Sequence, residues 1–174
     1  MIESIALALV KTLATYLFKT YVLVQTNVKI EGAPSWYMKN VPSAVCVYDA
    51  QYGGLESIDA AKASALGRMN KELTAIIENV IYDNYRNLKD PKEKAFVYMF
   101  KNDAESPIFL QKNTKFPNIE YSKKQRIAYV QACVDKQTII DYQTERSEKI
   151  KHELTHKRAG DAFEELESGD MKLE

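Results

Sequence analysis

Residues 57–81, SIDAAKASALGRMNKELTAIIENVI, form the stretch that decides the fold. Apolar side chains recur there at spacings of three and four residues, which places them on one face of an α-helix. Ser57 can cap the first turn and Asp90-Pro91 stops the helix, so the sequence predicts a helix over residues 56–88. Small residues begin this face and larger ones end it, as expected for a helix that packs across a sheet. The face comprises Ile58, Ala61, Ala65, Met69, Leu73, Ile76, Ile77, Val80 and Ile81.

Apolar runs on both sides of this helix predict strands. Residues 44–51 and 126–134 are rich in the β-branched and aromatic residues that favour strands, and residues 21–30 alternate in the same way. Asp135 follows the second of these runs and can cap a helix that begins at Lys136.

Two more strands are expected at residues 95–101 and 107–112, followed by a polar connection over residues 113–125, which contains Pro117. The last thirty residues are heavily charged, and we interpret them as a helical arm that frays into a flexible tail. Together the elements predict an α+β fold: a mainly antiparallel sheet with the long helix packed across one face, plus an N-terminal amphipathic helix and a C-terminal helical arm.

The first 21 residues have the periodicity of an amphipathic helix. Lys11 interrupts the apolar run before the ~20 residues that a membrane span needs, and Glu3 stands where a secretion signal would be positive. We expect the apolar side to pack against protein, across the subunits of a homo-oligomer, while contact with a membrane surface stays open. That side is formed by Ile5, Leu9, Leu13 and Leu17.

Trp36 is the only tryptophan, and Tyr37 follows it in a loop punctuated by Gly32, Pro34 and Pro42. Tryptophan and tyrosine are common at binding hot spots, so both are candidate interface residues. The simpler interpretation, which we favour, is that Trp36 closes one end of the core.

Four fragments carry a family resemblance by their order and spacing. They are Gly32-Ala33-Pro34-Ser35-Trp36, the strand-like Ala44–Ala50, the Ala-rich helix opening at Ile58-Asp59-Ala60-Ala61, and Tyr129-Val130-Gln131-Ala132-Cys133-Val134-Asp135-Lys136-Gln137. The chain resembles the LPP20-like family of bacterial envelope and flagellum-associated proteins over about residues 32–145.

The resemblance implies a non-enzymatic structural or assembly protein that acts by self-association or by docking to a larger envelope assembly. It divides the chain into residues 1–31, an LPP20-like domain at 32–145 and a charged arm at 146–174. It implies a location in the periplasm or at the outer membrane. The chain departs from the family in two ways: no lipobox cysteine follows the first helix, which leaves a cytoplasmic location open, and Asp49 and Gln51 stand where the family often has glycines.

The competing hypothesis is a small zinc-dependent hydrolase. His152-Glu153-Leu154-Thr155-His156 matches H-E-x-x-H, in which two histidines one helical turn apart bind Zn²⁺ and the glutamate activates water. The neighbouring cations disfavour a metal ion, and no partner that would orient the imidazoles is evident. We therefore expect no metal, no cofactor and no catalytic site. The flanking cations are Lys149, Lys151, Lys157 and Arg158.

The composition limits the classes of partner that the chain is expected to bind. Lysine plus arginine and aspartate plus glutamate both number 24, which gives a formal net charge of zero. Nucleic-acid binding, which usually requires a basic excess, is disfavoured. Cys46 and Cys133 lie in two apolar predicted strands, so we expect two buried thiols. A disulfide would require that these strands adjoin and that the compartment is oxidising.

Overall fold

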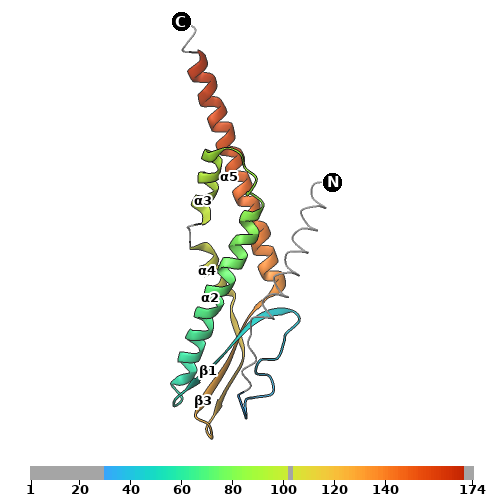
Figure 1. The fold of residues 1–174 in the computed structure, drawn as a ribbon, viewed down its shortest axis with the longest axis vertical. Helices are drawn as coiled ribbons and strands as arrows, with labels where there is room; N and C mark the ends of the chain where they lie inside the picture. The colour runs from blue at the N-terminus through green and yellow to red at the C-terminus, as the bar shows by residue number, and fades with distance from the viewer. Residues whose placement is uncertain (1–29, 102–103, 171–174) are drawn as a thin grey trace.

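A computed structural model describes residues 30–101 and 104–170 of the 174-residue chain. The described elements follow one another along the chain and combine strands with helices (Figure 1). The α+β prediction is confirmed. In order, they are β1 (Ala44–Tyr52), α2 (Ser57–Asp83), α3 (Pro91–Lys101), α4 (Glu105–Asn113), β2 (Lys115–Ser122), β3 (Ile127–Asp135) and α5 (Lys136–Asp170).

The three described strands form an antiparallel sheet in the order β1-β3-β2. β1 pairs with β3 along its whole length, from Ala44 opposite Asp135 to Tyr52 opposite Ile127. β3 is therefore the central strand, and every residue from Ile127 to Val134 is buried. The predicted strands 44–51 and 126–134 correspond to β1 and β3.

The long helix α2 packs across one face of the sheet, as predicted (Figure 1). Val45 and Val47 of β1 share this core with alternate residues of β3 and with the apolar face of α2. The buried helix residues are largely those of the predicted face, including Ala61, Met69 and Leu73. The small alanines lie at the start of the helix, where it approaches the sheet.

α5 follows β3 without a connecting loop. The Asp135 carboxylate accepts a hydrogen bond from the backbone N–H of Thr138 over 3.1 Å, which is the predicted cap. The 35-residue helix is about 52 Å long at 1.5 Å per residue and extends beyond the other described elements (Figure 1). It runs through Gly160, and among the described residues it is helical as far as Asp170.

Two of the predicted strands are wrong. Residues 95–101 lie in α3 and residues 107–112 lie in α4. α3 packs beside α2 and α5, and α4 packs beside α2 and contacts α5 through Tyr142. Short apolar runs do not distinguish a strand from a buried helix, and the β-branched and aromatic side chains favoured the wrong choice. Pro91 marks the start of α3, because proline suits the first position of a helix.

The predicted polar connection at 113–125 is also wrong, because it contains the edge strand β2. The pairing register shifts between Lys115 and Asn118, on either side of Pro117. Proline is tolerated on an edge strand or at a bulge, and this position meets both conditions. The predicted N-terminal helix and most of the strand at 21–30 lie outside the described residues. No helix in the described ranges is long and apolar enough to span a membrane.

Candidate functional site

The candidate interface residues Trp36 and Tyr37 lie against the face of the sheet opposite α2. They pack with Cys46, Tyr48 and Cys133 in a second apolar cluster. The ring of Tyr37 makes edge-on contacts with Tyr48, at 5.7 Å between centroids, and with the central-strand residue Tyr129, at 5.1 Å. The structure thus places this loop as a cover over the second face of the sheet.

Trp36 is only partly buried, and its indole N–H donates to the Glu120 carboxylate on β2 over 3.4 Å. The loop is also held at its start, where the Gln125 side chain donates to the backbone carbonyl of Glu31. Gly32 adopts φ +76° beside Gln125, a left-handed conformation that favours glycine. The Gly-Ala-Pro-Ser-Trp fragment is therefore part of the folded domain.

The same surroundings perturb the Tyr37 hydroxyl. Burial raises the pKa of Tyr37 to about 12, and the negative charge of Asp49 adds to this effect. Burial likewise raises the pKa of Tyr48, although its hydrogen bond with Gln131 opposes the shift. Neutral tyrosines are thus part of the packing between the loop and the sheet.

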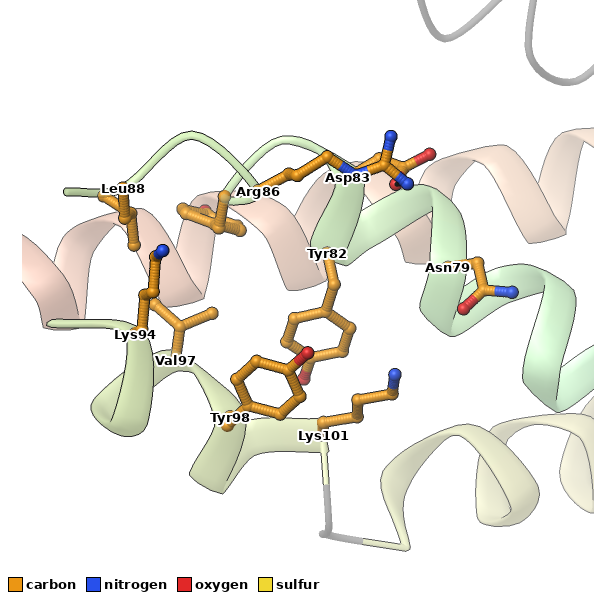
Figure 2. A pocket seen from close by; sticks show the side chains of 10 residues that line it. Asn79, Tyr82, Asp83, Arg86, Leu88, Lys94, Val97, Tyr98 and Lys101 are labelled. Carbon is orange, nitrogen blue, oxygen red and sulfur yellow. Dashed lines mark ion pairs between the residues drawn. The ribbon is translucent and has the colours of Figure 1, made fainter. Parts of the chain in front are cut away.

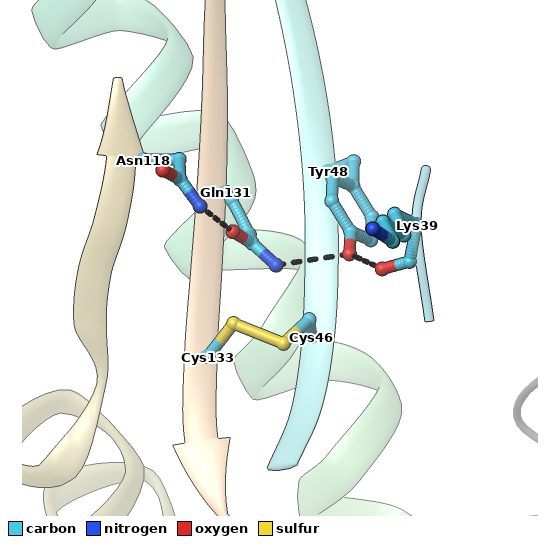
Figure 3. Close-up of a disulfide and its surroundings, with 6 residues drawn as sticks. All are labelled: Lys39, Cys46, Tyr48, Asn118, Gln131 and Cys133. Atoms are coloured by element: carbon cyan, nitrogen blue, oxygen red, sulfur yellow. Dashed lines mark hydrogen bonds between the residues drawn. A yellow bond between two sulfur atoms is a disulfide. The ribbon is translucent and has the colours of Figure 1, made fainter. Parts of the chain in front are cut away.

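Cys46 and Cys133 form a disulfide between β1 and β3, so the expectation of two thiols is wrong (Figure 3). They lie directly opposite each other in the strand register, and their Cα atoms are 4.1 Å apart. The sequence alone does not show which strands pair, so it cannot distinguish two thiols from a disulfide. The register brings together two residues that are 87 positions apart.

A row of polar side chains crosses the sheet beside the disulfide (Figure 3). The Asn118 amide donates to the Gln131 side-chain oxygen over 2.6 Å, and the Gln131 amide donates to the Tyr48 hydroxyl over 2.9 Å. Tyr48 in turn donates to the backbone carbonyl of Lys39 in the covering loop. The row joins β2, β3, β1 and the loop, and it satisfies the buried amide of Gln131.

A second polar cluster is buried between the helices. The Ser106 hydroxyl on α4 donates to the Glu78 carboxylate on α2 and lies 2.9 Å from the Tyr142 hydroxyl on α5. Ser106 is completely buried, so a substrate cannot reach this hydroxyl. We assign the cluster a structural role, because it positions α4 between the two long helices.

A pocket of about 280 Å³ lies where the end of α2 meets residues 84–90 and α3 (Figure 2). The Lys101 ammonium lies 5.7 Å from the centre of the Tyr82 ring and 5.6 Å from that of Tyr98. Arg86 forms an ion pair with Asp83 over 3.2 Å. Lys101 lies in the last turn of α3, where the carboxyl end of a helix attracts cations, so its position there does not require a ligand. No sequence pattern indicates this pocket, because the residues of α3 have the pattern of a strand.

The two histidines lie on the exposed surface of α5. The His152 and His156 rings are one helical turn apart, with centroids separated by 4.4 Å, and Glu153 between them is exposed. Within residues 30–101 and 104–170, no group of three or more histidine, cysteine or acidic side chains could hold a metal ion. A third protein ligand of the kind that catalytic zinc sites use is therefore not found in these ranges.

Three of the four neighbouring cations contact other carboxylates. Lys149 reaches Glu105 over 2.8 Å, Lys157 reaches Asp161 over 2.9 Å, and Arg158 forms two hydrogen bonds with Glu93, over 2.6 and 2.9 Å. The bond from Arg158 lowers the pKa of Glu93, and the bond to Asp161 raises the pKa of Lys157. These charges are thus directed to neighbouring side chains.

The projecting end of α5 exposes two large apolar side chains. Phe163 is 68% exposed and Leu166 is 67% exposed, and they lie three residues apart on one side of the helix. The predicted interface residues of the first helix, Ile5, Leu9, Leu13 and Leu17, lie outside the described residues. Among the described residues of α5, Phe163 and Leu166 are the large apolar side chains that are exposed.

Comparison with known proteins does not identify a relative: no family model matches the chain, and no curated protein matches it in sequence.

Proposed function

We propose that the protein is a non-enzymatic structural or assembly protein of the bacterial cell envelope or flagellar apparatus that acts by self-association through α5. The single observation that carries this proposal is the projecting end of α5, with Phe163 and Leu166 both about two-thirds exposed. Two neighbouring apolar side chains on a helix that projects beyond the rest of the domain offer a surface that a partner can cover.

The disulfide supports a location in the cell envelope. Disulfides form and persist in secreted and periplasmic proteins, whereas the cytosol keeps thiols reduced. Cys46 and Cys133 are joined in the core of the second sheet face, which agrees with an oxidising compartment. The resemblance to envelope proteins over residues 32–145 points in the same direction.

The inward position of Trp36 and Tyr37 adds to the argument. Because these side chains pack on the sheet, their loop is a weaker candidate for docking than α5. The alternative hydrolase is not proposed, since His152 and His156 lie on an exposed helix surface without a third ligand in the described ranges.

Light scattering coupled to size-exclusion chromatography tests the proposal, on full-length protein in EDTA. We expect an oligomer that loses mass when Phe163→Ser and Leu166→Ser are combined. The matched control combines Glu164→Ser and Glu167→Ser, which changes two exposed positions of the same helix and should leave the mass unchanged. A wild-type monomer at every concentration, or equal losses in both variants, would contradict self-association through this surface. Circular dichroism checks that each variant keeps its helix content.

A further inference from the structure

His152 and His156 present two imidazoles on one exposed face of α5. Their ring centroids are 4.4 Å apart, and the side chains emerge from successive turns of the helix. Histidines at this spacing can bind one ion together, and imidazole suits late first-row cations such as Zn²⁺, Ni²⁺ and Cu²⁺. The pair is thus a chelating unit, whether or not a catalytic glutamate acts beside it.

The local charge does not exclude such an ion. The sequence places four cations around the pair, but the structure directs Lys149, Lys157 and Arg158 to carboxylates on other turns or helices. The two histidines line a shallow surface depression on α5. Lys151 and Glu148, the latter one turn before His152, line the same depression. The net charge facing the pair is consequently close to neutral.

Within residues 30–101 and 104–170 of one chain the site is incomplete, because no third histidine, cysteine or acidic side chain joins the pair. Zinc held by protein alone is usually four-coordinate, and this pair supplies two ligands. The chain has only these two histidines, and both of its cysteines are used in the disulfide. No further imidazole or thiolate is therefore present to complete the shell.

A second copy of the chain would supply what is missing. An isologous dimer brings the same surface of both subunits together, so the two histidine pairs would meet across the symmetry axis as four nitrogen ligands. We propose that His152 and His156 form half of a divalent-metal site that a second copy completes, so that Zn²⁺ or a similar cation joins two α5 helices. The inference rests on the proposed self-association through α5 and adds a metal-dependent contact to it.

This role differs from that of a zinc protease. A bridging ion with four nitrogen ligands keeps no open position for water and needs no general base. Exposure of the helix surface, which argues against catalysis, is what a contact between two copies requires.

The experiment uses full-length protein freed of metal with EDTA, dialysed, and titrated with ZnCl₂ alone. We expect one zinc ion per two chains by elemental analysis, together with an increase in mass by light scattering that EDTA reverses. His152→Ala and His156→Ala should each abolish both effects. Lys151→Ala and Thr155→Ala, on the same face, should retain them. Cobalt(II) gives a second readout, because a four-coordinate cobalt site absorbs strongly in the visible range.

The outcomes separate this inference from the proposed function. One zinc per chain without a change in mass, or binding that survives both histidine substitutions, would overturn the bridged site. An oligomer that forms in EDTA, depends on Phe163 and Leu166, and ignores zinc would support the proposed function and overturn the inference. A protein that is monomeric in EDTA and pairs only with zinc would support the bridged site and contradict the apolar interface.

Discussion

The Arg146 guanidinium on α5 donates a hydrogen bond to the backbone carbonyl of Phe100 on α3, over 2.7 Å. The same side chain forms an ion pair with Glu105 at the start of α4, and it is only 1% exposed. One arginine thus connects the end of α3, the start of α4 and the first third of α5.

Arg146→Ala should destabilise the protein strongly. We expect a loss of about 3 kcal/mol, at the low end for a broken buried ion pair, because Glu105 is 41% exposed and also pairs with Lys149. Urea denaturation measures this change. Arg86→Ala, which removes an exposed ion pair with Asp83, should cost less than ~1 kcal/mol. Equal costs would show that Arg146 does not hold the helices together.

Truncation of the α2 face should be costly at its centre. Leu73 and Ile77 are 4% and 1% exposed, so replacing either with alanine should cost about 2–5 kcal/mol through lost burial and a residual cavity. Lys71→Ala on the exposed side should cost less than ~0.5 kcal/mol. Thermal or urea unfolding of the three variants provides the comparison, and a large effect at Lys71 would mean that the helix face is misassigned.

Loss of the disulfide should lower stability without changing the fold. The bond between Cys46 and Cys133 closes a loop with a sequence separation of 87 residues, for which the chain-entropy argument gives a loss of about 4.6 kcal/mol. The combined variant Cys46→Ala and Cys133→Ala should unfold at a lower urea concentration than wild type. A reductant should lower the urea midpoint of wild type and leave that of the variant unchanged. Alkylation and mass spectrometry of unreduced protein should find no free thiol. Two modified cysteines would disprove the bond.

Alkaline pH should unfold the protein by ionising buried tyrosines. Because the folded-state pKa of Tyr37 is raised from 10.0 to about 12, its contribution to stability is complete below pH ~10 and is lost as the pH rises toward 12. Burial shifts the pKa of Tyr85 and Tyr129 in the same direction. Absorbance at the phenolate band should show tyrosines that ionise late in folded protein and near pH 10 in urea. Tyr37→Phe should reduce the part of the absorbance change that occurs at high pH. A single transition near pH 10 in both states would contradict the burial of these side chains.

The parts of the fold that the sequence predicts correctly are those with a clear pattern of apolar residues. The α2 face repeats over seven turns, and β1 and β3 are apolar runs between polar residues, so their type and place are correct. Asp135 is a local cap and is also correct, because its hydrogen bond reaches only three residues ahead.

The errors fall where local pattern and tertiary context disagree. Residues 95–101 have the composition of a strand, yet α3 packs against α2 and α5, and packing outweighs propensity. Pro117 suggested a loop, although an edge strand accommodates it. Local sequence patterns do not predict contacts between residues that are far apart in the chain. These contacts include the disulfide, the Arg146 contacts and the ion pairs of Lys149 and Arg158.

The disulfide also sets the path of mechanical force through the molecule. Cys46 lies near the start of β1, and Cys133 lies three residues before the first residue of α5, whose backbone N–H is bonded to the Ser43 carbonyl. Tension applied between the segment before β1 and the projecting end of α5 passes from one cysteine to the other through covalent bonds. Residues 47–132, with α2, α3, α4 and β2, are excluded from that path, so a pull on the two ends would leave most of the folded domain unstretched.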